Sequence, residues 1–142
     1  MKVSARNVFR GTVKQLRNGA VNAEVVVQLP GGNDLVAIVT EESVKSLGLA
    51  QGKDVVALVK APWVMLMTDA EGIRLSARNC LAGTVKSVAD GAMNAEVVLD
   101  LGGGSEVVAV VTRDAVAELG LAAGVKATAV IKASHVILGV PS

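Results

Sequence analysis

The sequence predicts an all-β protein with one short helix per repeat, folded as two tandem five-stranded barrels. Three observations predict this class. The 142-residue chain contains the same pattern twice, valine-rich segments fill most of each copy, and a single helical signal interrupts those segments in each copy. Valine is typical of strands, and the segments are bounded by Gly, Asn or Pro.

The internal repeat is the strongest of these observations. Residues 4–7 (SARN) recur as residues 76–79, and residues 22–26 (NAEVV) recur as residues 94–98. We therefore expect a first domain at residues 1–68, a linker at 69–75 and a second domain at 76–142.

The elements of the first copy follow from its pattern. Strands are expected at residues 3–16, 20–29, 35–40, 55–60 and 63–67. Between the third and fourth strands, Thr40 is a good N-cap, acidic residues occupy the next turn, and Gly48 can end a helix. The second copy has the same layout, with its helix between Thr112 and Gly120. Five strands with a helix in this position is the order of a small OB-like barrel.

Composition excludes several classes of function. The chain has one cysteine and one histidine, so a Cys/His zinc site and a histidine-rich catalytic set are excluded. Its formal charge of +1 and its 1% aromatic content argue against avid nucleic-acid binding. No signal segment is visible, and the apolar windows 55–67 and 127–140 are too short to span a membrane. We expect a cytoplasmic protein that binds no membrane.

The small size of each copy predicts association. A unit of about 65 to 70 residues buries only roughly 60% of its unfolded surface, so it gains stability by packing against another unit. Fused copies can pack within a chain or between chains, and closed symmetric rings are the usual outcome.

Two repeated segments hold the candidate functional residues, Ser-Ala-Arg-Asn and Lys-Ala. Their hydroxyl, guanidinium, ammonium and backbone N–H groups are hydrogen-bond donors that suit a fully ionised oxyanion. No carboxylate lies within either segment. The alternative interpretation is that Arg6 and Arg78 pair with surface acids, the asparagines fix a turn, and the lysines are solvated.

Thr40 and Thr112 also have two interpretations, helix N-caps or direct ligands, and the roles can coexist. The copies differ nearby: Ser43 becomes Ala115, and Pro62-Trp63 becomes Ser134-His135. If both copies form sites, those sites should differ chemically.

Taken together, Ser-Ala-Arg-Asn, Gly-Thr-Val, Ala-Glu-Val-Val-Val, Leu-Gly-Leu and Lys-Ala-Pro-Trp-Val resemble the molbindin family, whose unit is the Mop or TOBE domain. Two copies covering almost the whole chain resemble its tandem, di-Mop members. The resemblance implies an OB-like fold for each copy and a non-catalytic protein that binds molybdate, and tungstate as its mimic, for molybdenum storage or homeostasis.

The resemblance also implies where the anion binds. Family sites lie between domains, and a two-domain chain would form a homotrimer with molybdate or tungstate as ligand and no organic cofactor. The implied oxyanion-binding residues are Ser4, Ala5, Arg6, Asn7, Thr40, Ser43, Lys60, Ala61, Ser76, Ala77, Arg78, Asn79, Thr112, Lys132, Ala133 and Ser134. Asn7 and Asn79 are expected to brace the backbone of their segments, and Ala115 removes one hydroxyl from the second copy.

Two other functions compete with this hypothesis. An OB-type module can bind single-stranded nucleic acid, but this chain lacks the basic groove and stacking aromatics that such binding uses. The chain could also be an oxyanion-sensing accessory subunit of a regulator or transporter. That role would need a partner protein, because no helix-turn-helix or intact phosphate loop is evident.

Overall fold

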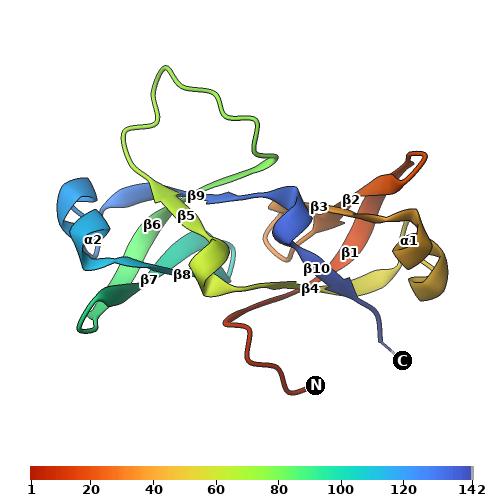
Figure 1. Cartoon of the computed structure of the whole chain (residues 1–142), viewed down its shortest axis with the longest axis horizontal. Helices are drawn as coiled ribbons and strands as arrows, with labels where there is room; N and C mark the ends of the chain where they lie inside the picture. The colour runs from red at the N-terminus through yellow and green to blue at the C-terminus, as the bar shows by residue number, and fades with distance from the viewer. Residues whose placement is uncertain (142) are drawn as a thin grey trace.

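The computed structural model describes residues 1–141 and arranges them as two β-sheet units side by side (Figure 1). The first repeat contributes β1 (Asn7–Asn18), β2 (Asn22–Gln28), β3 (Asp34–Thr40), α1 (Glu41–Leu47), β4 (Asp54–Val59), the 3-10 turn η1 (Ala61–Trp63) and β5 (Met65–Met67). The second contributes β6 (Asn79–Asp90), β7 (Asn94–Gly102), β8 (Ser105–Thr112), α2 (Arg113–Leu119), β9 (Lys126–Ile131), η2 (Ala133–His135) and β10 (Ile137–Gly139). The predicted fold class, mostly β with one short α-helix per repeat, is confirmed.

Each sheet buries one face in an aliphatic core. Alternate residues of β2 and β7 point inward, and Val25, Val27, Val97 and Leu99 are fully buried. This period-two burial is what the valine-rich segments predict. A β-bulge between Val13 and Gln15 bends β1 so that it pairs with both β2 and β4, and β6 carries the equivalent bulge.

The two sheets exchange their last strands. Strand order is β10-β4-β1-β2-β3 in one sheet and β5-β9-β6-β7-β8 in the other. Ile137 of β10 thus pairs with Leu58 of the first repeat, and Met65 of β5 pairs with Val130 of the second. Each sheet therefore takes four strands from one repeat and one from the other. Because each sheet includes one strand of the other repeat, the sheets do not coincide with the sequence repeats. The domain boundaries expected at residues 68 and 76 therefore describe the repeats and stay a prediction.

Both α-helices begin and end as the sequence predicts. Thr40 and Thr112 are N-caps whose hydroxyl oxygens accept from the backbone N–H groups of Ser43 and Ala115, each at 3.1 Å. Gly48 ends α1 with a φ of 63°, a left-handed conformation that glycine adopts without steric cost.

Three predicted strands of the first repeat begin later than expected, and for β2 the difference is only two residues, Asn22 in place of residue 20. Residues 3–6 precede β1, because β4 ends at Val59, the partner of Asn7, and offers no further residue for pairing. Residues 61–63 form η1 before β5 begins at Met65, and Pro62 occupies the first turn of η1, where its missing N–H is not needed. These two irregular segments carry four of the eight candidate site residues of the first repeat: Ser4, Ala5, Arg6 and Ala61.

The hairpin tips of the two repeats touch at the junction. A Cβ on Gly31 would lie 2.8 Å from the Cα of Gly103, and a Cβ on Gly103 would lie 2.6 Å from the Cα of Gly31. Ser105 also donates a 3.1 Å hydrogen bond to the carbonyl oxygen of Pro30. The close approach therefore depends on glycine at both tips.

Candidate functional site

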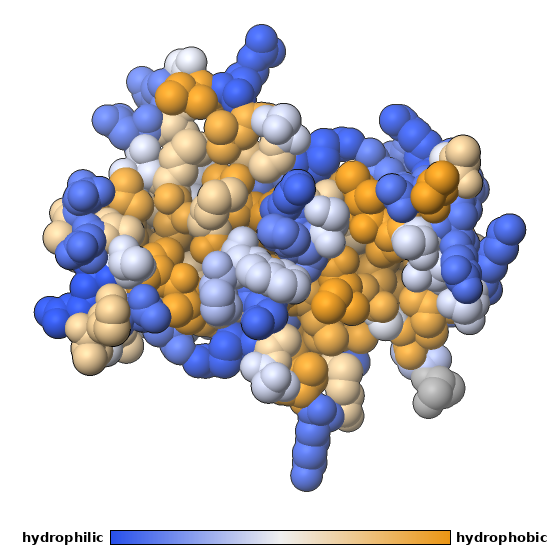
Figure 2. All heavy atoms as spheres, viewed as in Figure 1, coloured by the Kyte–Doolittle hydropathy of each residue, from blue (hydrophilic) through white to orange (hydrophobic). Residues whose placement is uncertain are grey.

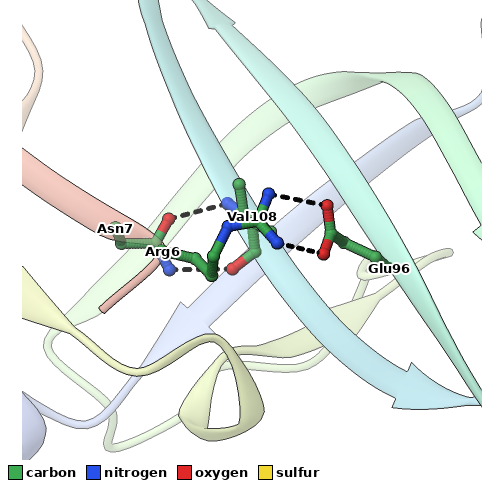
Figure 3. A network of polar contacts seen from close by, with 4 residues as sticks. All are labelled: Arg6, Asn7, Glu96 and Val108. Atoms are coloured by element: carbon green, nitrogen blue, oxygen red, sulfur yellow. Dashed lines mark hydrogen bonds and ion pairs between the residues drawn. The ribbon is translucent and has the colours of Figure 1, made fainter. Parts of the chain in front are cut away.

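The asparagine of each Ser-Ala-Arg-Asn segment is bound to the other repeat. The Asn7 amide donates to the Val108 carbonyl at 2.8 Å and accepts from the Val108 N–H at 2.7 Å (Figure 3). Asn79 makes the same pair of bonds to Val36. Both side chains are almost fully buried, at 2% and 1% exposure. These amides brace the segments by binding the edge strands β8 and β3.

The arginine of each segment is also paired across the junction. Arg6 donates through both terminal nitrogens to the carboxylate of Glu96 on β7, with the Nη2–Oε1 distance 2.8 Å (Figure 3). Arg78 pairs in the same way with Glu24 on β2, at 3.1 Å for Nη2–Oε1. The interpretation that these arginines pair with acids therefore holds for the isolated chain.

Each Ser-Ala-Arg segment lines a cavity together with the Lys-Ala segment of its own repeat. The first cavity, about 410 Å³, contains Ser4, Ala5, Arg6, Lys60 and Ala61, with Glu96 and Val110 from the other repeat. The second, about 530 Å³, contains Ser76, Ala77, Arg78, Lys132, Ala133 and Ser134, with Ile38 from the other repeat. Each cavity thus gathers a serine and two cationic side chains. The second cavity has a further serine, Ser134, and the first includes the carboxylate of Glu96.

The helix-capping residues lie in other cavities. Thr40 and Ser43 line one of about 300 Å³ together with Ser134 of the second repeat, which the strand exchange brings there. Thr112 lines a separate one of about 530 Å³ beside Asp114. Within one chain, therefore, the structure does not bring Thr40, Ser43 or Thr112 into the cavities of the arginines.

The surroundings of the two arginine cavities differ. Trp63 lines the second cavity and packs against His135, with ring centroids 4.8 Å apart and ring planes tilted by 33°. Lys60 Nζ lies 5.4 Å from the centroid of the Trp63 ring. His135 Nδ1 is buried and has no hydrogen-bond partner. An aromatic wall therefore belongs to the second cavity, although Trp63 comes from the first repeat.

Sequence reasoning missed Glu24 and Glu96, because it asked which acids lie within each segment. Both glutamates belong to the repeated Ala-Glu-Val-Val segment, where one acid interrupts an apolar strand. A single acidic residue within an apolar strand was the sequence signal that could have pointed to these two glutamates. Among residues 1–141, no group of three or more His, Cys, Asp and Glu side chains could hold a metal ion, and no helix is long and apolar enough to cross a membrane.

Comparison with known proteins identifies relatives along the full chain. The TOBE domain model matches residues 3–66 and 75–138. The solved structure of the cytoplasmic molybdate-binding protein ModG, with molybdate bound, is 66% identical and has a TM-score of 0.96, covering 99% of this chain and 100% of that one.

Longer proteins are similar as well. The molybdenum-pterin-binding protein MopA of Rhodobacter capsulatus is 48% identical over 99% of this chain and 53% of its own length. The molybdenum transport protein ModE of Azotobacter vinelandii is 48% identical over 99% of this chain and 52% of its own length. The chain thus spans about half the length of these curated relatives.

Proposed function

The chain belongs to the TOBE domain family, and on this basis we propose that it binds molybdate, and tungstate as a close mimic, without catalysing a reaction. The observation that carries the proposal is that each repeat places Ser-Ala-Arg and Lys-Ala in one cavity at the junction between repeats. The likeness to molybdate-bound ModG over the full length supports the same ligand. We further propose a cytoplasmic role in molybdenum storage or homeostasis.

Capture would use donors that the fold already holds in place. Molybdate is a dianion with acceptor oxygens on every side, so it is matched by hydroxyl, backbone N–H, guanidinium and ammonium groups. Arg6 and Lys60 supply two positive charges to the first cavity, and Arg78 and Lys132 supply two to the second. Ser4, Ser76 and the backbone of Ala5 and Ala77 add directed donors beside those charges. No bond to the anion's metal is needed.

A complete family-type site would need more than one chain. The implied ligands include Thr40, Ser43 and Thr112, which lie outside the arginine cavities of a single chain. A second copy could present them to those cavities, and we propose a homotrimer with anion sites between domains.

The surface supports association between copies. Apolar side chains cover much of the face in Figure 2, on both halves of the molecule. Val8 and Ile137, 38% and 54% exposed, both pair with Leu58 and form an apolar row across β1, β4 and β10. A row of this kind favours docking against another apolar surface.

The direct test is calorimetry of the purified full-length chain with sodium molybdate, together with its mass in solution. We expect saturable binding by a trimer, similar binding of tungstate, and much weaker binding of sulfate and phosphate. Metal analysis of the protein as isolated would show whether it carries molybdenum or tungsten. A monomer that ignores both anions would contradict the proposal.

A role as the oxyanion-sensing part of a regulator is the second candidate, because ModE of Azotobacter vinelandii aligns with almost all of this chain over about half its own length. Such a role would need a partner that supplies the remaining function. Mixing the molybdate-loaded chain with candidate regulator proteins in size-exclusion chromatography would detect a stable complex.

A further inference from the structure

We propose that Glu96 and Glu24 are positioning residues for the two anion cavities. Each glutamate holds the arginine of the opposite repeat's Ser-Ala-Arg segment, and we infer that this contact sets the anion affinity of the cavity. The inference rests on the proposed function, since it concerns the same cavities. Neither glutamate is among the oxyanion-binding residues that the family resemblance implies.

The glutamates belong to a repeated geometric unit. On the edge strand β8, Val108 binds Asn7, and Val110, two residues further on, lines the first cavity. Glu96 is the β7 partner of Val110 and binds Arg6. On β3 the same arrangement recurs: Val36 binds Asn79, Ile38 lines the second cavity, and its β2 partner Glu24 binds Arg78.

This unit anchors the Ser-Ala-Arg segment, which is not hydrogen-bonded into the sheet. Residues 3–6 precede β1 and have no strand partner, so the Arg6–Glu96 pair is the side-chain contact that anchors them next to the buried Asn7. Fixing a long side chain before the ligand arrives removes an entropy cost that binding would otherwise carry. The pair therefore keeps Ser4, Ala5 and Arg6 facing the same cavity.

The pairing leaves the arginine able to bind an anion. A guanidinium has five N–H donors, and a carboxylate bound to both terminal nitrogens uses two of them. The three remaining donors can serve an oxyanion while the glutamate stays in place. Arg6 can thus contact Glu96 and the ligand together.

A positioning role for the glutamate and a simple charge effect predict opposite changes in anion affinity. A glutamate repels a nearby dianion, so if it acted through charge alone, replacing it with glutamine would strengthen binding. If it positions the arginine, the same change weakens binding, because a neutral amide offers the guanidinium one acceptor oxygen in place of two. The direction of the change separates these roles.

The test compares Glu96→Gln and Glu24→Gln with the wild-type chain in calorimetry with sodium molybdate. We expect each variant to weaken its own class of site by roughly two- to fivefold, the range for partly exposed ion pairs. The larger loss is expected for Glu24→Gln, because the Glu24 side chain is 19% exposed and that of Glu96 is 32% exposed. Unchanged or tighter binding in both variants would overturn the proposal.

A matched control is Glu106→Gln. Glu106 pairs with Lys86 at 3.1 Å and lines neither arginine cavity, so its replacement removes the same charge and an ion pair without touching an anion site. The anion affinity of the Glu106→Gln variant should equal that of the wild type. If Glu106→Gln weakens binding as much as Glu96→Gln does, the loss does not depend on contact with the cavity arginine and the proposal fails.

Two further measurements separate positioning from a general loss of structure. Each single variant should split the isotherm into a weakened class and an unchanged class, whereas partial unfolding would weaken both. Where Glu96→Gln fails to fold, Glu96→Asp replaces it: the charge stays, but the shorter side chain loses the two-point contact and should still weaken binding. Wild-type affinity in Glu96→Asp would then overturn the proposal.

The proposed function and this inference fail in different ways. If the wild-type chain binds no molybdate, the function is wrong. If the wild type binds and the glutamine variants bind equally well, the function stands and the positioning role is wrong.

Discussion

The two repeats keep the same donors and place them against different neighbours. Serine, arginine, asparagine, threonine and lysine recur at equivalent positions, yet Trp63 of the first repeat lines the cavity of the second, and Ser134 of the second lies beside Thr40 of the first. The strand exchange causes this crossing, because η1 precedes β5 and η2 precedes β10. Each repeat thus completes the surroundings of the other, and paired substitutions in the two repeats can measure how equivalent the halves are.

The largest effect is expected at the buried asparagines. Asn79→Leu leaves the N–H and C=O of Val36 without their side-chain partners, which should cost about 4 kcal/mol of unfolding free energy. Asn7→Leu should cost less, because its bonds to Val108 are only partly buried and water can replace them in part. Chemical denaturation of the two variants measures the difference.

Ala82→Ser, a substitution at an exposed position of β6, is a suitable control for handling and expression, and it should leave the unfolding free energy close to that of the wild type. Equal losses in the two asparagine variants would show that the two junctions are energetically equivalent despite their difference in burial.

A smaller loss is expected at the hairpin tips. Gly31→Ala places a Cβ 2.8 Å from the Cα of Gly103 and also strains a residue with a φ of 94°, which together should cost about 3 kcal/mol. The matched control is Gly32→Ala, which has the same φ of 94° and no atom within 4 Å of its Cβ.

The difference between these two alanine variants in thermal denaturation isolates the contact between repeats from the backbone strain. If Gly32→Ala is as destabilising as Gly31→Ala, the tips do not press on one another in solution and the junction is looser than the structure indicates.

The lysines provide the corresponding comparison for binding. Lys60→Ala and Lys132→Ala should each weaken anion binding by about 2 kcal/mol, the scale of a hydrogen bond to a charged group. Lys60 and Lys132 are exposed in the single chain, so the loss should be smaller than for a buried charge pair. Calorimetry of the single and double variants with molybdate measures it, with Lys86→Ala as the control outside both cavities.

Unchanged stoichiometry and affinity after replacing both lysines would remove them from the site. A loss confined to one class of site in each single variant would instead show that the two cavities bind independently. Because Lys60 also lies over the Trp63 ring, fluorescence from this one tryptophan offers a second readout for the Lys60 variant.

Much of the fold could be predicted from sequence because the signals are local. Valine alternation locates the strands, Thr40 and Gly48 locate α1, and the repeat doubles every inference. The strand exchange could not be predicted, since Met65 and Ile137 occupy equivalent positions and would fit either sheet equally well by pattern. Which of the two sheets each one joins depends on how the repeats pack.

The sequence predicted which hydrogen-bond donors belong to the candidate site, but it did not predict how these donors are arranged in space. Ser4, Arg6 and Lys60 share a cavity, as a site would require, but Thr40 and Ser43 do not join them within one chain. The acids that bind the arginines lie in the opposite repeat, so spacing along the chain carries no sign of the contact. Long-range pairing of this kind has to be observed in the structure.

The smallest expected effect concerns the one hydroxyl that distinguishes the helix caps. Thr40 Oγ1 donates to Ser43 Oγ at 2.9 Å, whereas the equivalent Thr112 faces Ala115. Ser43→Ala and Ala115→Ser should each change the unfolding free energy by about 0.5 kcal/mol, because the backbone cap itself is kept in both. In the first variant the Thr40 hydroxyl loses an acceptor, and in the second the Thr112 hydroxyl gains one.

The same two substitutions give a more specific test when anion binding is measured. If the Ser43 hydroxyl contacts the anion in the assembled protein, Ser43→Ala should weaken one class of site, and Ala115→Ser should strengthen the other by a similar factor of roughly two to ten. Calorimetry on the two variants and on their combination measures both changes. A double variant whose two affinities exchange values would show that this single hydroxyl makes the sites unequal; unaltered affinities would leave the difference to Trp63 and His135, which the strand exchange places on one cavity wall.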